Sequence, residues 1–298
     1  MQFPITIIPR EKFSDHPLLA RLLQLHDVPE QIYIAGVLPE IKLDEYGRST
    51  PRILTVVGSR KHTQYGKQAI EKLISLLEGE EVIIVSGLAH GIDSIAHISA
   101  LKNNLKTFAI LGNGLDKKVM YPSTHLNLAE EIVDSGGLLI SELSPLTEAA
   151  QWTFPARNRI VAALSDAVLI VEAEEKSGTL ITARIALELG RDIGAIPGEI
   201  FSPTSVGTNT LIRDGAYIVT NEDDLFSLLH LSKKEKEIQT ENYSNEEKII
   251  MDLLIEPKEK DALLIESKLN PSKFLITLSS LEMKGKIQET FGEVRRIV

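Results

Sequence analysis

The sequence predicts an α/β fold built on a parallel sheet, and a pattern repeated three times between residues 53 and 116 carries this prediction. Each copy is a short β-branched apolar run that ends in a glycine turn and is followed by a helix-like segment. Apolar runs without alternation are typical of strands buried on both faces. The spacing leaves room for one crossover helix between strands. Ligands of such sheets bind beyond the carboxyl ends of the strands, where the glycine turns lie.

The composition is that of an ordinary soluble globular protein. Of its 298 residues, 43% are hydrophobic and 25% are charged, which suits one large domain plus a smaller one. No apolar run is long enough to span a membrane, the start of the chain lacks a signal-peptide core, and no cysteine is present. We therefore expect a cytoplasmic protein without a membrane partner. Because the net charge is −10, a nucleic-acid site must be a local patch.

The expected elements follow the chain in order. Residues 1–50 form an N-terminal extension, with a short amphipathic helix over 17–25, a strand over 31–35 and a loop over 44–51. The main domain is expected over 51–231. Its strands are expected at 53–57, 82–85, 107–111, 137–141, 167–171, 193–196 and 216–219, and two of its helices at 156–164 and 180–189.

The composition changes after residue 231. The polar, charged stretch 232–243 is interpreted as a linker. Ser244-Asn-Glu-Glu247 is a capping box that predicts a helix through Leu254. Two further helices and a hairpin are expected before residue 298. Three helices and a hairpin within 244–298 indicate a small C-terminal winged-helix domain, although other small α+β modules share the pattern.

Two helix starts are candidate anion sites. Gly58-Ser59-Arg60 lies where a strand leads into a helix, so its backbone amides suit a phosphate, and Arg60 adds a bidentate donor. A tight turn with a surface arginine explains the same residues equally well. Ser177-Gly178-Thr179 opens another helix and serves either as a second anion site or as a simple N-cap.

A polar cluster over 152–159 joins two arginines and an asparagine to two aromatic rings. Such a cluster combines phosphate donors with rings that stack on bases. The alternative is a structural arginine network that bridges acidic residues such as Glu142 and Glu172. Both hold if one arginine is structural and the other is exposed.

Other motifs favour structure over chemistry. Asp93 and His97 share one helix face, and they suit either an acid/base pair or a polar pair that orders the turn. The second is favoured because no nucleophile is evident. Tyr65-Gly66-Lys67 lacks the Walker spacing, and Gly112-Asn113-Gly114 has Lys117 where a dinucleotide motif needs a small residue. Neither ATP hydrolysis nor NAD binding is supported.

Ten motifs match a known family in its own order. They are VGSR (57–60), SGLAHGIDSIAH (86–97), LGNGLD (111–116), YP (121–122), FPARNR (154–159), VEA (171–173), SGTLITA (177–183), GR (190–191), IPG (196–198) and GTN (207–209). On these motifs, residues 50–228 resemble DNA processing protein A, the DprA or Smf family. The resemblance implies an extended Rossmann-like domain that binds single-stranded DNA, helps to load the RecA recombinase in natural transformation and forms a homodimer. It implies no catalytic turnover, and we expect no cofactor and no metal.

The same resemblance implies a DNA groove lined by the strand-end turns and helix starts. The expected contacts are Gly58, Ser59, Arg60, Gly87, Leu88, Ala89, Gly91, Gly112, Gly114, Lys117, Lys118, Arg157, Asn158, Arg159, Ser177, Gly178 and Thr179. Some members carry a lysine directly after the Tyr-Pro pair, where this chain has Ser123. Lys117 and Lys118 are the candidates to replace it.

The alternative function is a Rossmann-like hydrolase of nucleoside monophosphates. Such enzymes resemble this chain around Ser177–Thr179, in a PGGxGTxxE motif whose glutamate assists catalysis. Here Thr182 occupies the glutamate position, and no proline-glycine pair precedes Ser177. An interaction module that has lost its ligand site is a third possibility, disfavoured by the intact polar turns. The sequence therefore favours a single-stranded DNA-binding protein that is not an enzyme.

Overall fold

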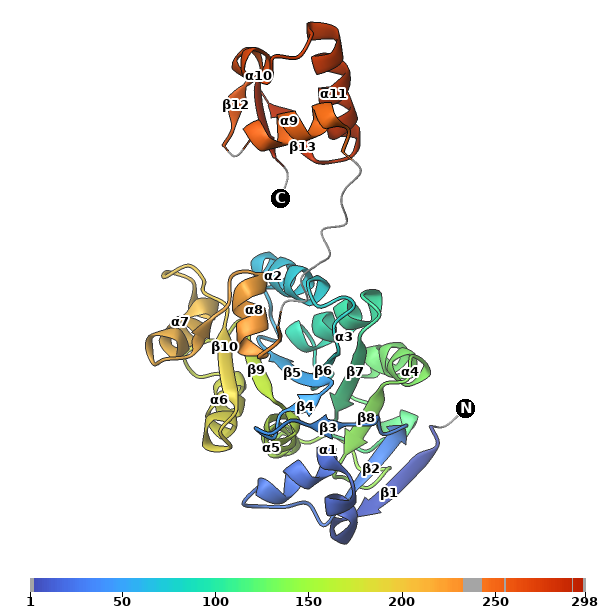
Figure 1. Cartoon of the computed structure of the whole chain (residues 1–298). Coiled ribbons are helices and arrows are strands. Elements are labelled where there is room, and N and C mark those ends of the chain that lie inside the picture. Colours follow the sequence, from blue (N-terminus) through green and yellow to red (C-terminus); the bar gives the residue numbers. More distant parts are fainter. Residues whose placement is uncertain (1–2, 233–242, 255, 291, 297–298) are drawn as a thin grey trace. The chain divides into compact units, whose positions relative to one another are not determined.

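The computed structural model describes residues 3–232, 243–254, 256–290 and 292–296 (Figure 1). The chain divides into two compact units, Met1–Ser232 and Lys233–Val298. The interior of the expected linker, 233–242, lies outside the described residues. Among the described residues, no helix has the length and apolar character needed to cross a membrane.

A nine-stranded sheet in the order β1-β2-β8-β7-β6-β5-β9-β10-β11 forms the centre of the first unit. Its strands are β1 (Ile5–Pro9), β2 (Gln31–Gly36), β5 (Arg52–Val57), β6 (Val82–Ser86), β7 (Lys106–Ile110), β8 (Leu138–Ser141), β9 (Ala167–Ile170), β10 (Asp192–Ala195) and β11 (Tyr217–Ile218). Neighbouring strands from β8 to β11 are parallel, which confirms the predicted sheet.

Two antiparallel strands extend this sheet, so it is mixed rather than wholly parallel. β2 pairs antiparallel with β8, and β1 pairs antiparallel with β2. The sequence did not predict β1, because this edge strand is only partly buried and lacks the continuous apolar pattern of the central strands. The N-terminal extension therefore belongs to the main sheet. It also contributes the small hairpin β3 (Lys42–Leu43) and β4 (Ser49–Thr50).

Helices cover both faces of the sheet. They are α1 (Pro17–Ala20), α2 (Gln64–Ser75), α3 (Ile92–Lys102), α4 (Leu126–Asp134), α5 (Thr153–Leu164), α6 (Gly178–Glu188), α7 (Val206–Arg213) and α8 (Glu222–Leu228), with 3-10 helices at Arg10–Asp15, Arg21–Gln24, Lys117–Val119, Ser123–His125 and Pro203–Ser205. The expected helix over 17–25 is thus one α-helical turn continued by a 3-10 helix.

The strands are buried on both faces because successive side chains enter different cores. In β6, Ile83 and Val85 join a core with α5 and α6, whereas Val82 and Ile84 join a core with α2, α3 and α8. The two groups of helices lie on opposite sides of the sheet (Figure 1). This arrangement explains why the sequence shows continuous apolar runs instead of alternation.

The sheet reverses its winding direction at β5. β6, β7 and β8 follow β5 on one side, whereas β9, β10 and β11 extend it on the other. The carboxyl ends of β5 and β9 therefore form a topological switch point. In open α/β sheets, ligands bind in the crevice at such a point.

The second unit is a small α+β module with its own core. It contains α9 (Asn245–Leu253), β12 (Lys258–Glu259), α10 (Lys260–Ser267), α11 (Pro271–Met283), β13 (Ile287–Thr290) and β14 (Glu293–Arg296). The three strands form an antiparallel sheet in the order β12-β14-β13, of which the sequence did not predict β12. The capping box of Ser244 and Glu247 opens α9 as predicted. Phe274, Leu278 and Leu281 of α11 contribute to the core of the unit.

His97 of α3 is a fully buried imidazole that is neutral in the folded chain. Its Nδ1 lies 2.7 Å from Thr107 Oγ1 of β7, and this hydroxyl donates its proton to the Ile84 carbonyl. The hydroxyl therefore accepts from Nδ1–H, and Nε2 has no partner among the described residues. Burial lowers the pKa of His97 from 6.5 to about 3, and the nearby charges of His125 and Arg157 act in the same direction.

This burial predicts a loss of stability in mild acid. Between pH 6.5 and about 3, the unfolded chain binds a proton at His97 that the folded chain does not. The free energy of unfolding should therefore fall on acidification by up to about 1.4 kcal/mol per pH unit. His97→Gln should reduce this slope. Urea unfolding at pH 7 and pH 5, followed by the fluorescence of Trp152, the single tryptophan, measures it. Equal slopes in both proteins would contradict the assignment.

Candidate functional site

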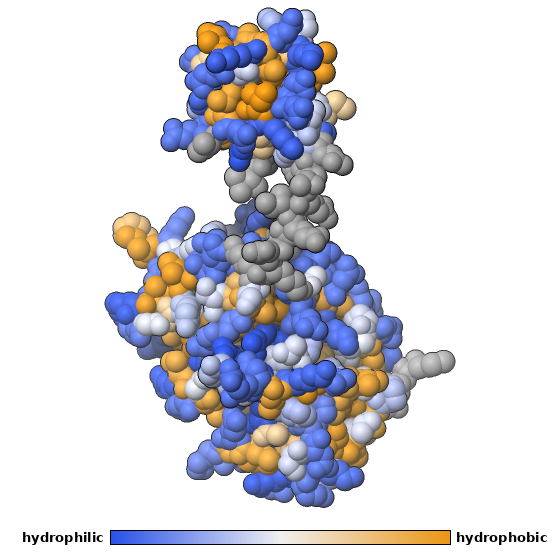
Figure 2. Space-filling model, viewed as in Figure 1, coloured by the Kyte–Doolittle hydropathy of each residue, from blue (hydrophilic) through white to orange (hydrophobic). Residues whose placement is uncertain are grey.

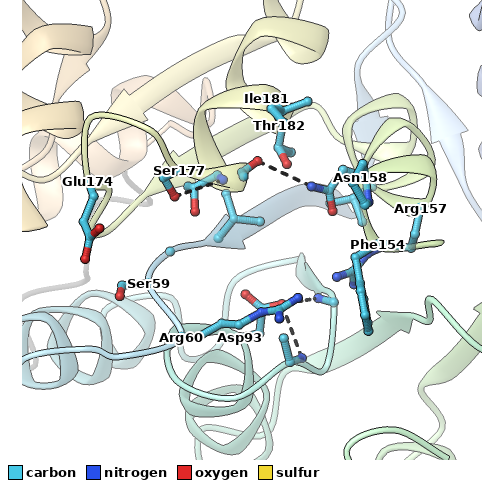
Figure 3. Close-up of a pocket in the computed structure, with 18 of the residues that line it drawn as sticks. Ser59, Arg60, Asp93, Phe154, Arg157, Asn158, Glu174, Ser177, Ile181 and Thr182 are labelled. Carbon is cyan, nitrogen blue, oxygen red and sulfur yellow. Dashed lines mark hydrogen bonds between the residues drawn. The ribbon is translucent and has the colours of Figure 1, made fainter. Parts of the chain in front are cut away.

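A cavity of about 570 Å³ lies at the switch point (Figure 3). The turns after β5 and β6 line one side, and the starts of α5 and α6 line the other. In Figure 3, Ser59 and Arg60 lie across the cavity from Ser177 and Asn158. Four segments far apart in the sequence therefore meet where parallel strands end.

The cavity unites ten of the seventeen expected contacts. They are Gly58, Ser59, Arg60, Gly87, Ala89, Arg157, Asn158, Ser177, Gly178 and Thr179. Gly112 lines a small adjoining cavity together with Arg60 and Phe154. The other expected contacts do not line the main cavity. They are Leu88, Gly91, Gly114, Lys117, Lys118 and Arg159.

Two glycines are required for close approaches between the turns. A Cβ on Gly87 would lie 1.6 Å from Nη1 of Arg157. Gly91 has φ +80°, and a Cβ there would lie 2.3 Å from the Ser59 carbonyl oxygen. Glycine at position 91 therefore lets the turn after β6 pack directly against the backbone of the turn after β5. Leu88 is fully buried, which accounts for its place outside the cavity.

The two lysines proposed to replace the family lysine lie elsewhere. Lys117 forms an ion pair with Glu130, and its Nζ lies 4.7 Å from the centre of the Phe3 ring. Lys118 is exposed on the 3-10 helix Lys117–Val119. Its backbone amide donates to the side chain of Asp116, which caps this helix. Neither side chain lines the cavity.

The first expected anion site needs correction, because α2 begins at Gln64 and not directly after Arg60. Its N-terminus is closed by the carboxylate of Glu172, which accepts from the Thr63 amide at 3.0 Å and from the Thr63 hydroxyl. A Cβ on Gly66 would lie 2.5 Å from the same carboxyl group. Glu172 therefore occupies the place of an external anion at α2, and among the described residues it forms no ion pair with an arginine.

The N-terminus of α6 is open. Ser177 caps the helix by accepting from the Thr179 amide at 3.2 Å. Gly178 is exposed, and nothing lies within 4 Å of a Cβ built on it. The first turn of α6 contains no acidic residue. Because this end carries the positive pole of the helix and lines the cavity, it suits an anion.

Arg60 offers an exposed cation on the opposite side. Its guanidinium carbon lies 4.8 Å from the centre of the Phe154 ring, and this ring contacts Tyr121 at 5.6 Å between centroids. Within the described part of the chain, Arg60 has no ion-pair partner. Its charge is therefore available to a ligand, with two aromatic rings beside it.

The two arginines of α5 are both structural. Arg157 is 5% exposed, and its Nη1 donates to the Ile110 carbonyl at 2.6 Å. Arg159 forms an ion pair with Glu142, and its Nη2 lies 3.6 Å from Oδ2 of Asp27. The predicted structural arginine network is therefore present at Glu142. The sequence allowed one of these two arginines to be exposed, and neither of them is.

Asp93 lies beneath the turn after β6 and orders it. Its carboxylate accepts from the Gly87 amide at 3.1 Å and from the Ala89 amide at 3.4 Å. Burial raises the pKa of Asp93, whereas the charge of Arg157 lowers it. The sequence favoured Asp93 and His97 as a polar pair that orders this turn. Asp93 has that role, whereas His97 contacts Thr107 of β7.

Several cavity residues were missed as site residues. Tyr121, Gln151, Lys176 and Ile181 also line the cavity. Tyr121 belongs to the quoted Tyr-Pro motif, which was a usable signal. The others lie in loops or on a helix face whose orientation only the fold determines.

The burial of Arg157 predicts losses of stability of very different size for two arginine variants. Arg157→Ala should lower the free energy of unfolding by about 3 kcal/mol, because it removes the positive charge that offsets the burial of the Asp93 carboxylate. Arg60→Ala should change it by less than about 0.5 kcal/mol, because Arg60 is exposed. Urea unfolding followed by Trp152 fluorescence compares them. Similar stabilities of both variants would contradict the structural role of Arg157.

Comparison with known proteins identifies the family. The family model of DNA recombination-mediator protein A matches residues 10–230. DNA processing protein DprA of Streptococcus pneumoniae is 41% identical over 206 residues, which cover 69% of either chain. Protein Smf of Escherichia coli is 40% identical over 209 residues, which cover 70% of this chain but only 53% of that protein.

Solved structures agree with this result. The X-ray structure of DNA processing protein A from Streptococcus pneumoniae has a TM-score of 0.62 at 36% identity, and the match covers 76% of this chain and 74% of that one. DNA processing protein A from Helicobacter pylori, whose structure was analysed for its single-stranded DNA binding mode, has a TM-score of 0.63 at 30% identity, with coverage of 77% and 99%. The chain belongs to the DNA recombination-mediator protein A family, whose members carry the names DprA and Smf.

Proposed function

We propose that this chain binds single-stranded DNA in the cavity at the ends of β5 and β9. The observation that carries the proposal is the pairing of Arg60, exposed beside Phe154, with the open N-terminus of α6 across one cavity. A cation and helix amides hold phosphates, and aromatic rings stack on bases. The described binding of single-stranded DNA by the Helicobacter pylori relative supports the same ligand.

Binding in this cavity should depend on the phosphate backbone of the DNA more than on its base sequence. Phosphate contacts position a strand without identifying its bases, and ring stacking tolerates every base. The net charge of −10 limits the attraction to a local patch, so only a few phosphates are engaged. The proposed ligand is therefore a strand of any sequence.

We infer that the chain binds without catalytic turnover. In the alternative, a hydrolase of nucleoside monophosphates, a glutamate is needed at the position of Thr182. Thr182 is 1% exposed and lines the cavity without any charge. Asp93 lines the cavity, and its carboxylate accepts hydrogen bonds from the amides of Gly87 and Ala89. Both observations favour the binding protein.

Membership of a recombination-mediator family supports a cellular role in recombination. We infer that the chain delivers single strands to the RecA recombinase, in natural transformation or in general DNA recombination, and that it acts in the cytoplasm. We also propose that the second unit is a winged helix-turn-helix. The order of its elements, helix, strand, two helices and a hairpin, supports this assignment.

We propose in addition that the first unit forms a homodimer through the β11 end of the sheet. The strand order ends at β11, and Tyr217 and Ile218 of this strand are 43% and 48% exposed. Ile200 and Phe201, in the loop after β10, are 78% and 91% exposed. A strand edge with exposed apolar side chains favours association with another chain.

The binding proposal makes a prediction for Arg60. In Arg60→Ala, the slope of log affinity against log salt should fall in magnitude by about 0.7, the share of one phosphate on a single strand. Affinity should weaken by about 1.5–3 kcal/mol, as for a charged hydrogen bond. Fluorescence anisotropy with one labelled oligonucleotide at several salt concentrations measures both.

Arg213→Ala is the matched control, because Arg213 is an exposed arginine of α7 outside the cavity. It should leave slope and affinity nearly unchanged. The site assignment is wrong if Arg60→Ala binds with wild-type slope and affinity, or if the control variant loses as much.

The dimer proposal makes a prediction for Ile218. Ile218→Asp places a charge on the exposed edge strand, so it should weaken association at least about tenfold because a desolvated charge opposes burial. Sedimentation velocity over a range of protein concentrations measures the change. Glu222→Ala, a change at the start of α8, serves as a control for this end of the unit. An unchanged sedimentation profile of Ile218→Asp would exclude this edge as the interface.

A further inference from the structure

Helix α11 of the second unit has an apolar outer face. Its inner side chains, such as Phe274 and Leu281, are buried in the core of the unit. On the outer side, Leu275, Ile276 and Met283 are 52%, 70% and 90% exposed. Apolar residues are visible on the surface of this unit in Figure 2. Three large apolar side chains exposed on one 13-residue helix call for a partner.

The geometry of the helix joins these side chains into one stripe. With 3.6 residues per turn, Leu275 lies on one side of Ser279, and Ile276 and Met283 lie on the other. Ser279 is therefore a small residue at the centre of an apolar stripe. A small central residue allows a second helix to approach closely.

The charges of the unit argue against nucleic acid as the partner. Residues 243–298 carry nine basic and ten acidic side chains. Four of the lysines are held in ion pairs within the unit: Lys258–Glu266, Lys260–Glu289, Lys273–Glu246 and Lys284–Glu247. A helix that reads the major groove presents arginine, lysine, asparagine or glutamine to base edges. The outer stripe of α11 presents leucine, isoleucine, methionine and serine, with Glu282 at its edge.

We propose that α11 docks against α11 of a second copy of this chain, with the two helices antiparallel about a twofold axis at Ser279. In this arrangement Leu275 lies at the same level as Met283 of the other copy, and the two serines meet at the crossing. A twofold axis brings the same surface from both chains together, so the face must be self-complementary. An apolar stripe centred on a small residue meets this condition.

One charge favours the antiparallel orientation. Glu282 is exposed in the last turn of α11, where the negative pole of its own helix disfavours it, and no ion pair involves it in the described part of the chain. In an antiparallel pair, Glu282 lies beside Leu275 of the second copy, in the N-terminal half of that helix and towards its positive pole. A parallel pair would instead leave both Glu282 carboxylates at the negative poles of the two helices.

The size of the face sets the expected strength. Three large side chains and Ser279 from each copy make a small contact, at most near the lower limit of about 1,000 Å² for specific association. The pairing should therefore be weak and depend on concentration. It is separate from the proposed β11 interface, because the two contacts use different units.

Single cysteines test the geometry directly, because the chain contains no cysteine. Full-length Ser279→Cys, mildly oxidised, should form a disulfide-linked dimer at least about tenfold faster than a control, since paired sites have a high effective concentration. The matched control is Lys248→Cys, on an exposed position of α9. Non-reducing electrophoresis over time gives the rates.

The orientation is tested with two further variants. An equal mixture of Leu275→Cys and Met283→Cys should cross-link faster than either variant alone, because only the antiparallel pair brings these positions together. Adding Leu275→Glu to Ser279→Cys should reduce the rate to that of the control. Circular dichroism checks that this variant is folded, and the mixture test stands without it.

Three results would overturn the proposal. The first is a Ser279→Cys rate equal to that of Lys248→Cys. The second is faster linkage of Leu275→Cys with itself than in the mixture, which would indicate a parallel pair. The third is loss of duplex DNA affinity in Leu275→Glu with cross-linking of Ser279→Cys at the control rate, which would assign the face to nucleic acid.

Discussion

The site depends on one buried cation. The guanidinium group of Arg157 lies beneath the turns after β6 and β7, donates to the Ile110 carbonyl and reaches the space that a side chain on Gly87 would fill. Its charge also offsets the burial of Asp93, which binds the amides of Gly87 and Ala89. Removing the cation would loosen both turns together. An arginine, the residue type that most suggests a DNA contact, therefore builds part of the wall of the cavity.

Two helix N-termini lie near this wall, and the chain treats them differently. The carboxylate of Glu172 closes α2 from within, whereas α6 opens into the cavity with Ser177 as its cap. In the proposed function, the anion binds at α6 and at the exposed Arg60, whose position over Phe154 combines charge with a stacking surface. This asymmetry explains how a chain of net charge −10 can offer a local site for a polyanion.

The sequence revealed the central sheet because each strand is buried on both faces, which imposes a continuous apolar run. It did not reveal β1, an edge strand with partial burial, or the place of α2, whose cap involves Thr63 and a glutamate 109 residues away. Residue type and spacing also did not show that Arg157 is buried and Arg60 exposed, because the burial of Arg157 depends on how α5 packs under the turns. The Tyr-Pro motif at 121–122 was visible in the sequence, but only the tertiary fold shows that Tyr121 lines the cavity.

The central claim is that this cavity holds a DNA single strand and not a nucleotide substrate. The most direct measurement compares binding of the full-length chain to a single-stranded oligonucleotide, its duplex and a nucleoside monophosphate in one buffer, with release of free base followed in parallel. The expected result is tight binding of the single strand, weaker binding of the duplex, little binding of the monophosphate and no released base. A monophosphate that binds as tightly as the strand and loses its base would contradict the account.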